Sequence, residues 1–190
     1  MKVFIQCPIC KTVLLSDWDG NINSRYRCAK CGTEPFFNNT VLPALSVKQP
    51  WAYLICAGLK DIENRTWKLP EKYKGTRVLI HAGAKRASQF NNIFTDNQWD
   101  AMGEYARVEC VLRQSPVSAI IGSVEIVDCV INHPSIWAGK TYRWNWLKGE
   151  LIEKEKRDVI YNWVLKNPVL FDKPILNIKG QLGFFKPKID

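Results

Sequence analysis

Two CxxC motifs near the N-terminus constrain the fold of this chain more than any other feature. Cys7 and Cys10 form the first motif, Cys28 and Cys31 form the second, and seventeen residues separate the two. Each CxxC makes a tight knuckle whose sulfurs converge on one ion, and the spacer is long enough for a β-hairpin that returns the second knuckle to the first. The spacing therefore predicts a small zinc-ribbon module with four cysteine ligands.

Four thiolates leave no open position on Zn²⁺, so we expect the ion to be structural. A module of about forty residues buries little core, and the metal should supply much of its folding free energy. Asp19-Gly20 is a turn signal between residues 13–15 and 25–27, which predicts that these two segments pair. Two unrelated thiol pairs are the alternative. Three further cysteines lie among apolar residues and are expected to be core residues: Cys56, Cys110 and Cys129.

The chain carries a formal net charge of +9, with a sequence pI of about 9.2. Such a surplus favours an acidic partner, and nucleic acid comes ahead of a membrane surface. Residues 1–10 lack the sustained apolar run of a secretory signal, and no run approaches the ~18 apolar residues that span a bilayer. We therefore expect no membrane partner and a cytoplasmic location, where paired cysteines more often hold metal than form disulfides.

A linker is expected at residues 33–43, which are aperiodic and contain Pro and Asn. This predicts two domains: a zinc ribbon over 1–40 and a larger domain over 44–190. A chain of 190 residues is long enough for one good core plus an accessory module of this size.

The larger domain is expected to contain two helices and several strands. Pro50 fits the first turn of one helix, and Thr95 with Gln98 forms a capping box for the other. The expected elements are a helix over 49–57, a strand over 77–82, a helix over 96–112, and strands over 119–130, 161–165 and 181–185. Strands interrupted by helices without regular βαβ alternation predict an α+β fold with a mainly antiparallel, barrel-like sheet.

Residues 45–86 concentrate side chains that bind phosphates, base edges and flat rings. Lys48 and Gln49 precede the first expected helix, where side chains and free backbone N–H groups can meet a phosphate. Arg65 and Trp67 can supply a guanidinium and a stacking plane for one unstacked base. The predicted nucleic-acid-binding residues are Lys48, Gln49, Trp51, Arg65, Trp67, His81, Lys85 and Arg86.

Several of these residues also have a structural interpretation. Trp51 could equally anchor the core, and Arg65 could form an ion pair with Glu63, two residues away on a strand face. A histidine in an apolar strand, such as His81, is more often a hydrogen-bonded core residue than a catalyst. A stripe of alternating aromatics could stack on bases or cover the barrel, and the second interpretation is slightly favoured: Trp137, Tyr142, Trp144 and Trp146.

A set of motifs spread over residues 44–186 resembles the ASCH domain, a branch of the PUA-like superfamily. The motifs are LSVKQPWA (45–52), AGLKDIENRTW (57–67), LIHAGAK (79–85), IIGSVEIVDCV (120–130), YNWVL (161–165) and KGQLGFF (179–185). The resemblance implies a PUA-like β-barrel with flanking helices and a cleft that holds the opening motifs. It also implies binding of RNA or a modified nucleotide, with the zinc ribbon as a fused accessory.

The resemblance also implies an enzymatic alternative. A small bacterial branch of the family hydrolyses N4-acylated cytidine with a lysine, a threonine and a glutamate. The lysine falls on Lys60 and the glutamate on Glu125, whereas Glu63 stands at the threonine position. A carboxylate cannot replace a hydroxyl nucleophile, although Glu63 could still act as a general base or orient water.

The sequence therefore predicts a nucleic-acid-binding module, with RNA favoured over DNA. The first alternative is an amidohydrolase of modified cytidine, or a ribonuclease, that uses Lys60, Glu63 and Glu125. The second alternative is a protein-interaction adaptor that docks through the zinc ribbon.

Overall fold

The computed structural model describes residues 2–6, 13–17, 25–26, 36–37, 42–87, 93–103, 112–145, 149–153 and 159–188. From residue 42 onward, the elements are β5 (Ala44–Gln49), α1 (Trp51–Cys56), β6 (Ile62–Arg65), the 3₁₀ turn η1 (Glu71–Tyr73), β7 (Thr76–Arg86), α2 (Asp96–Met102), β8 (Ala119–Ile131), β9 (Tyr142–Asn145), β10 (Glu150–Glu153), β11 (Tyr161–Ile175) and β12 (Phe184–Phe185).

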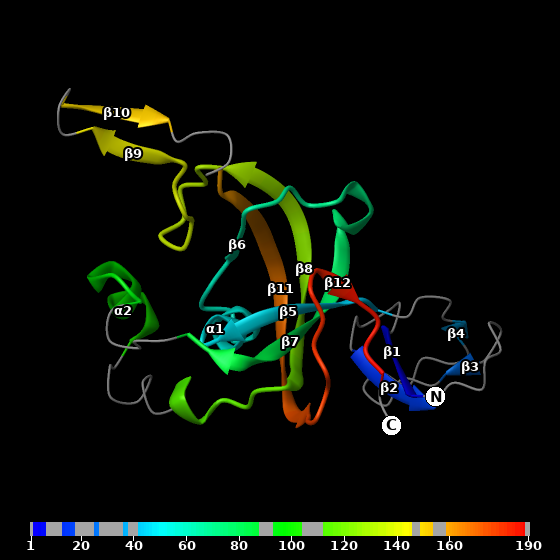
Figure 1. The fold of residues 1–190 in the computed structure, drawn as a ribbon. Helices are drawn as coiled ribbons and strands as arrows, with labels where there is room; N and C mark the ends of the chain where they lie inside the picture. The colour runs from blue at the N-terminus through cyan, green and yellow to red at the C-terminus, as the bar shows by residue number, and fades with distance from the viewer. Residues whose placement is uncertain are drawn as a thin grey trace.

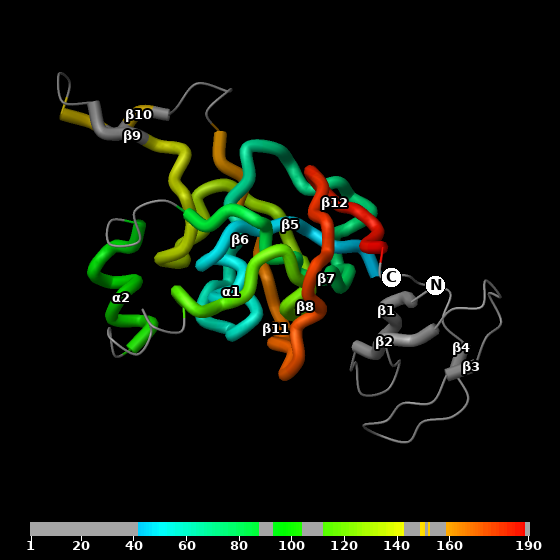
Figure 2. Tube along the Cα trace, turned by 60° about the horizontal axis from the view of Figure 1, so that its bottom comes forward, coloured from blue at the N-terminus to red at the C-terminus, as the bar shows by residue number. Residues whose placement is uncertain are grey.

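The main sheet of this part has six strands in the order β12-β5-β7-β8-β11-β6 (Figure 1). Strand β5 runs parallel to β7, and the other neighbours in the sheet are antiparallel. The β9–β10 hairpin is separate from this sheet and projects away from it in two views (Figures 1 and 2). A mixed sheet with few helices is consistent with a PUA-like β fold.

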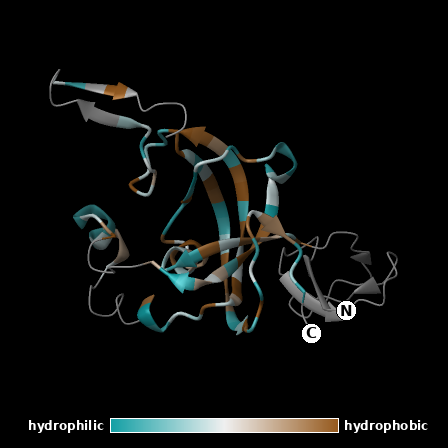
Figure 3. Ribbon diagram, in the orientation of Figure 1, coloured by the Kyte–Doolittle hydropathy of each residue, from teal (hydrophilic) through white to brown (hydrophobic). Residues whose placement is uncertain are grey.

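The apolar core lies along the central strands, as the hydropathy colouring shows (Figure 3). In β5, Leu45 and Val47 are buried in this core, whereas Lys48 is exposed. This alternation follows from the strand period of two, which sends successive side chains to opposite faces. Trp163 of β11 is fully buried in the same core.

A side-chain contact connects β6, at one end of the sheet, to β5. The Arg65 guanidinium donates from Nη2 to the backbone carbonyl of Ser46 at 2.8 Å. Strand β12 pairs only with Leu45 and Ala44 of β5, so Arg65 meets β5 just beyond that pairing. The sheet therefore curves far enough for its two ends to approach each other.

Helix α1 lies inside the expected range of 49–57 but begins at Trp51, so Pro50 is its N-cap residue and not part of its first turn; the buried face of the helix includes Leu54 and Ile55. The Gln49 side chain accepts a hydrogen bond from the Tyr53 backbone N–H at 3.0 Å, which satisfies a free donor of the first turn. Gly58 follows the helix with φ 78°, a conformation that favours glycine.

The second expected helix is correct at its start and wrong at its end. Thr95 and Gln98 form the capping box. The helix ends at Met102 because Gly103 adopts φ 94° and breaks the predicted helix over 96–112. Strand β8 matches its expected range, whereas β7 and β11 extend further than predicted.

The described strands before residue 42 form two antiparallel pairs. Strand β1 (Lys2–Gln6) pairs with β2 (Val13–Asp17), and β3 (Arg25–Tyr26) pairs with β4 (Phe36–Phe37). The prediction that residues 13–15 pair with 25–27 is therefore wrong. Strand β1 offers β2 five residue partners, more than the two-residue β3 could offer, and so satisfies more backbone groups.

No helix in the described part of the chain is both long enough and apolar enough to cross a membrane.

Candidate functional site

A cavity of about 320 Å³ opens beside α1 and β6. Its other walls come from the segment that follows β8 and from residues in and just before α2. The lining residues are Trp51, Lys60, Glu63, Asn64, Ile93, Gln98, Ile136, Trp137, Ala138 and Gly139. We call this cavity the Lys60–Glu63 pocket, after the two buried charges in its wall.

Glu63 lies between two cations. Its Oε1 is 2.9 Å from Arg65 Nη2, and its Oε2 is 3.7 Å from Lys60 Nζ. The predicted alternative of an Arg65–Glu63 ion pair is thereby confirmed. The side chains of Lys60 and Glu63 are only 4% and 10% exposed, so this contact is largely shielded from water.

Burial lowers the pKa of the Lys60 ammonium, and the attraction of Glu63 opposes that shift. Lys60 also donates to the backbone carbonyl of Ile62. The pair therefore presents a hydrogen-bond donor beside an acceptor at the pocket wall, in surroundings where such groups interact more strongly than in water.

Two tryptophans supply flat apolar surfaces. The rings of Trp51 and Trp137 lie 6.4 Å apart between centroids and meet at 76°. Trp51 also packs edge-on against Phe94 at 4.9 Å, and Lys60 Nζ lies 5.8 Å from the Trp51 ring centroid. Trp51 thus contacts the core, as one of its two interpretations predicted, and it also lines the pocket.

The pocket wall after β8 is fixed by two asparagines. Asn64 donates to the Trp137 carbonyl at 2.8 Å and accepts from the Gly139 N–H at 2.9 Å. Asn162, which is fully buried, donates to Asn64 Oδ1 and to the Gly139 carbonyl. A Cβ at Gly139 would lie 3.0 Å from Ile160, so the backbone approaches closely here. The wall is therefore held in one conformation.

Sequence reasoning missed both asparagines. A signal was available, because asparagine is depleted in strands and a buried amide is costly unless hydrogen-bonded. An asparagine within a strand pattern, such as Asn64 in β6 or Asn162 in β11, therefore indicates a specific polar contact.

Two predicted binding residues form hydrogen bonds to backbone carbonyls and do not line the pocket. Gln49 is buried, and its amide donates to the Pro116 carbonyl at 2.8 Å in addition to capping α1. Arg86 donates to the carbonyls of Leu112 and Ser115. Their polar groups are thus engaged in joining β5 and β7 to the segment around 112–116.

Trp67 packs within the protein. Its ring meets Trp163 edge-on at 4.6 Å and Phe184 at 6.1 Å. Arg65, which was expected to act beside Trp67, points to Glu63 and Ser46. The structure therefore links Arg65 to the pocket through Glu63, whereas Trp67 is partly buried and packs against the core.

Lys48, His81 and Lys85 line a second cavity, along β5 and β7. His81 is buried, with Nε2 2.9 Å from the Ile178 carbonyl and Nδ1 3.1 Å from Ser46 Oγ. Since a carbonyl only accepts, Nε2 carries the proton and the Ser46 hydroxyl donates to Nδ1. Burial lowers the pKa of His81, which matches the interpretation of a hydrogen-bonded core histidine.

Glu125 lies in a different cluster from Lys60 and Glu63. Arg77 Nη2 contacts Glu125 Oε1 at 3.0 Å, and the Asn167 amide donates to Oε2 at 2.8 Å. Glu125 does not line the Lys60–Glu63 pocket. Of the three candidate catalytic residues, the structure brings two together.

Several predictions fall outside the described residues. They are the zinc ligands Cys7, Cys10, Cys28 and Cys31, together with Cys110 and Trp146. Elsewhere, Cys56 is buried and Cys129 is partly buried, in agreement with core roles. In the ranges that the structure describes, no three His, Cys, Asp or Glu side chains gather as a metal site would require. Trp137 is buried and Tyr142 is exposed.

The mixed sheet and the few helices beside it are consistent with a PUA-like β fold. The model of the ASCH domain family matches residues 45–175, which is most of the chain. The chain therefore belongs to the ASCH domain family, a PUA-like family often associated with RNA binding. No curated protein matches the chain.

Proposed function

We propose that this protein binds single-stranded RNA and receives one unstacked base in the Lys60–Glu63 pocket. The observation that carries the proposal is a buried donor–acceptor pair beside two tryptophan rings. Proteins that recognise single-stranded RNA stack splayed bases on aromatic rings and hydrogen-bond to the exposed base edges. The family's association with RNA supports the choice of RNA over DNA.

The chemistry of the two charged groups suits a nucleobase. A base edge carries N–H donors next to oxygen or nitrogen acceptors. The Glu63 carboxylate can accept from such a donor, and the Lys60 ammonium can donate to the neighbouring acceptor. A cavity of about 320 Å³ falls at the lower end of the range of small-molecule sites, which is compatible with a single base.

The fixed wall favours binding for a second reason. Asn64 and Asn162 hold the Trp137–Gly139 segment through hydrogen bonds within the protein. A wall that is already ordered loses little conformational entropy when a ligand enters.

The test is fluorescence anisotropy with labelled RNA and DNA decamers at low salt. Lys60→Met removes the donor while Glu63 keeps Arg65 as its partner, so the variant should fold. We expect RNA affinity to fall about tenfold or more, since hydrogen bonds to charged groups contribute about 1.5–3 kcal/mol. Lys72→Met, at an exposed lysine, is the matched control and should bind as the wild type does. Affinities no better than millimolar for every RNA and DNA would refute the proposal.

Amidohydrolysis of an N4-acylated cytidine is a second candidate function, favoured by the lowered pKa of buried Lys60. In this reaction water adds to the acyl carbonyl, the C–N bond breaks, and the cytosine amine leaves with a proton. Lys60 in its neutral form could take up the proton of the water, and Glu63 could orient that water. Incubation of the zinc-loaded protein with N4-acetylcytidine tests this function. Turnover that disappears in Lys60→Ala would support it, whereas absence of turnover would exclude it.

We also propose that the N-terminal region binds a structural zinc ion. Each CxxC motif lies in the sequence that joins two antiparallel strands, β1 to β2 and β3 to β4. Hairpin connections of this kind suit the knuckles of a four-thiolate site. Metal analysis of the purified protein should find one zinc per chain, and Cys7→Ser combined with Cys28→Ser should lose it. A chain that folds with no bound metal would contradict the prediction.

A further inference from the structure

A second cavity, of about 580 Å³, runs along β5 and β7 beside residues 178–182. It contains three lysines, one from each of these segments: Lys48, Lys85 and Lys179. We call it the lysine groove. Strand β5 contributes Ser46 and Lys48 from the face opposite to the core residues Leu45 and Val47.

Within the described part of the chain, no acidic side chain compensates the charges of the lysine groove. All three lysines are exposed, and none forms an ion pair with another described residue. No aspartate or glutamate is among the described residues that line the groove. A concave surface with charges of one sign focuses the electrostatic potential and attracts ligands of the opposite sign.

The floor and one wall of the groove are fixed to each other. His81 joins the Ser46 hydroxyl to the Ile178 carbonyl, and the Ile178 N–H donates to the Ser118 carbonyl at 2.8 Å. A Cβ at Gly180 would lie 2.5 Å from His81 Cε1, so residue 180 packs its backbone directly against the floor. The groove is therefore a preformed shape.

Its rim is also suited to a ligand with apolar parts. Leu182 is 99% exposed at the edge of the groove, and the neighbouring Gln181 is exposed as well. Alternating anionic and flat apolar groups are characteristic of a nucleic acid strand, whose sugars and bases can cover such a leucine.

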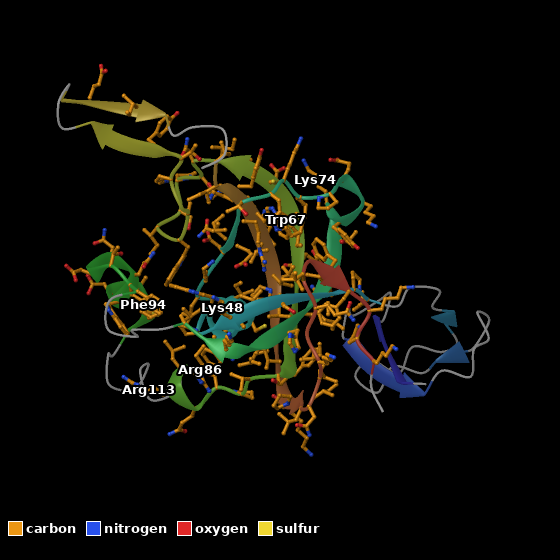
Figure 4. The ribbon with its side chains drawn as sticks, in the orientation of Figure 1. Lys48, Trp67, Lys74, Arg86, Phe94 and Arg113 are labelled. Atoms are coloured by element: carbon orange, nitrogen blue, oxygen red, sulfur yellow. The ribbon has the colours of Figure 1, made fainter. Side chains whose placement is uncertain are left out.

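The lysine groove and the Lys60–Glu63 pocket adjoin the same corner of the fold. Lys48 lies at the end of β5 that leads into α1 (Figure 4), and Trp51 of the pocket follows three residues later. Three residues span at most about 10 Å between Cα atoms. Arg65 adds a direct link, because it holds both Glu63 of the pocket and the Ser46 backbone of the groove.

We propose that the lysine groove binds the phosphodiester backbone of the RNA strand whose base enters the Lys60–Glu63 pocket. The inference rests on the proposed function and adds a second site to it. The groove lysines contact phosphates irrespective of sequence, and the pocket receives the base.

The test is the salt dependence of RNA binding. The affinity of the wild-type protein for a labelled oligouridine decamer is measured at several salt concentrations between about 50 and 200 mM. Each phosphate contact on a single strand contributes a slope of about 0.7, so loss of three contacts should lower the slope by about 2. The groove variant combines Lys48→Ala, Lys85→Ala and Lys179→Ala.

A matched variant removes the charges of three lysines that lie outside the groove. Lys68, Lys166 and Lys173 are exposed and do not line the groove, so their replacement by alanine should leave the slope near the wild-type value. Trp51→Phe should leave the slope unchanged as well, because residue 51 carries no charge and does not line the groove.

Each outcome decides between the proposals. Equal slopes for the groove and matched variants, with RNA still bound, would overturn the lysine groove and leave the proposed function intact. Absence of RNA binding in the wild type would overturn both. A fluorescent polyglutamate peptide serves as the probe for an acidic protein partner. Its binding through the groove lysines, in preference to the oligouridine, would overturn the assignment to RNA.

Discussion

The Lys60–Glu63 pocket and the lysine groove use charge in opposite ways, although both border the corner between β5 and α1. In the pocket, Lys60 and Arg65 flank one carboxylate and the charges are largely shielded from water. In the groove, Lys48 and Lys85 are exposed and have no acidic neighbour among the described lining residues. A paired, buried charge is costly to disturb, whereas a solvated charge contributes little to stability and attracts ions at a distance.

This difference separates two aspects of recognition. Polar groups that are held in fixed positions and shielded from water select ligands by geometry. A ligand that does not match them leaves a buried polar group without a hydrogen-bond partner. Solvated lysines supply affinity that depends on salt and not on sequence. Substitutions that test stability at one site and binding at the other would show whether the two sites differ in this way.

The largest expected effect is on stability, for Glu63→Gln. The substitution removes the carboxylate that Lys60 and Arg65 share, so both cations lose their ion-pair partner. We expect the free energy of unfolding to fall by about 3 kcal/mol, measured by urea denaturation. Glu71→Gln, at an exposed glutamate, should change it by less than about 0.5 kcal/mol. Similar small losses for both variants would mean that the buried pair is not structurally important.

The next largest effect concerns affinity, for Trp51→Ala. Loss of one stacking ring costs about 1–3 kcal/mol per base, so affinity for RNA should fall about 5- to 150-fold in anisotropy titrations. Because Trp51 also packs on Phe94, thermal melting must show that the variant is folded. Trp51→Phe keeps a flat ring and should recover most of the affinity. An alanine variant that folds and binds normally would place the base elsewhere.

A smaller effect is expected for Lys48→Ala alone. This exposed side chain should change the free energy of unfolding by less than about 0.5 kcal/mol, in contrast to Glu63. The slope of log affinity against log salt should fall by about 0.7. A large loss of stability would show that Lys48 is structural and that the two sites do not differ as proposed.

The smallest effect concerns pH and His81. Burial lowers the pKa of His81 in the folded protein, so the folded state favours the neutral ring. The unfolded chain binds a proton near pH 6.5, so the stabilisation is complete above that pH and is lost as pH falls towards the lower folded-state pKa. His81→Gln should therefore show a shallower decline of unfolding free energy between pH 7 and 5. A decline as steep as in the wild type would exclude this contribution.

Part of the fold could be predicted from local patterns. The capping box of Thr95 and Gln98 correctly predicted the start of α2. The run of β-branched residues predicted β8 to within one residue of its observed end. The helix break at Gly103 was missed because a glycine within an amphipathic pattern is often tolerated. The pairing of β2 with β1 was missed because the prediction considered the turn signal at Asp19-Gly20 but not the strand that precedes Cys7.

The candidate site was predicted only in part, and for a physical reason. Lys60 and Glu63 were singled out because the family resemblance places them at the positions of a catalytic lysine and threonine, and they do lie together. Gln49 and Arg86 looked equally suitable for binding, yet both satisfy backbone carbonyls of the segment around 112–116. That segment is distant in sequence, so no local pattern reveals it.

Sequence patterns alone were sufficient to predict the family, the α+β character and the residues that can carry charge or stack on a base. Tertiary structure decided which of those side chains face water. Glu125 illustrates the difference, since the pairing of β7 with β8 sets it opposite Arg77 and away from the Lys60–Glu63 pocket. Register between strands depends on long-range packing, and a side chain's face follows from register with a period of two. Residue identity therefore establishes what each group can do, and strand register establishes which groups act together.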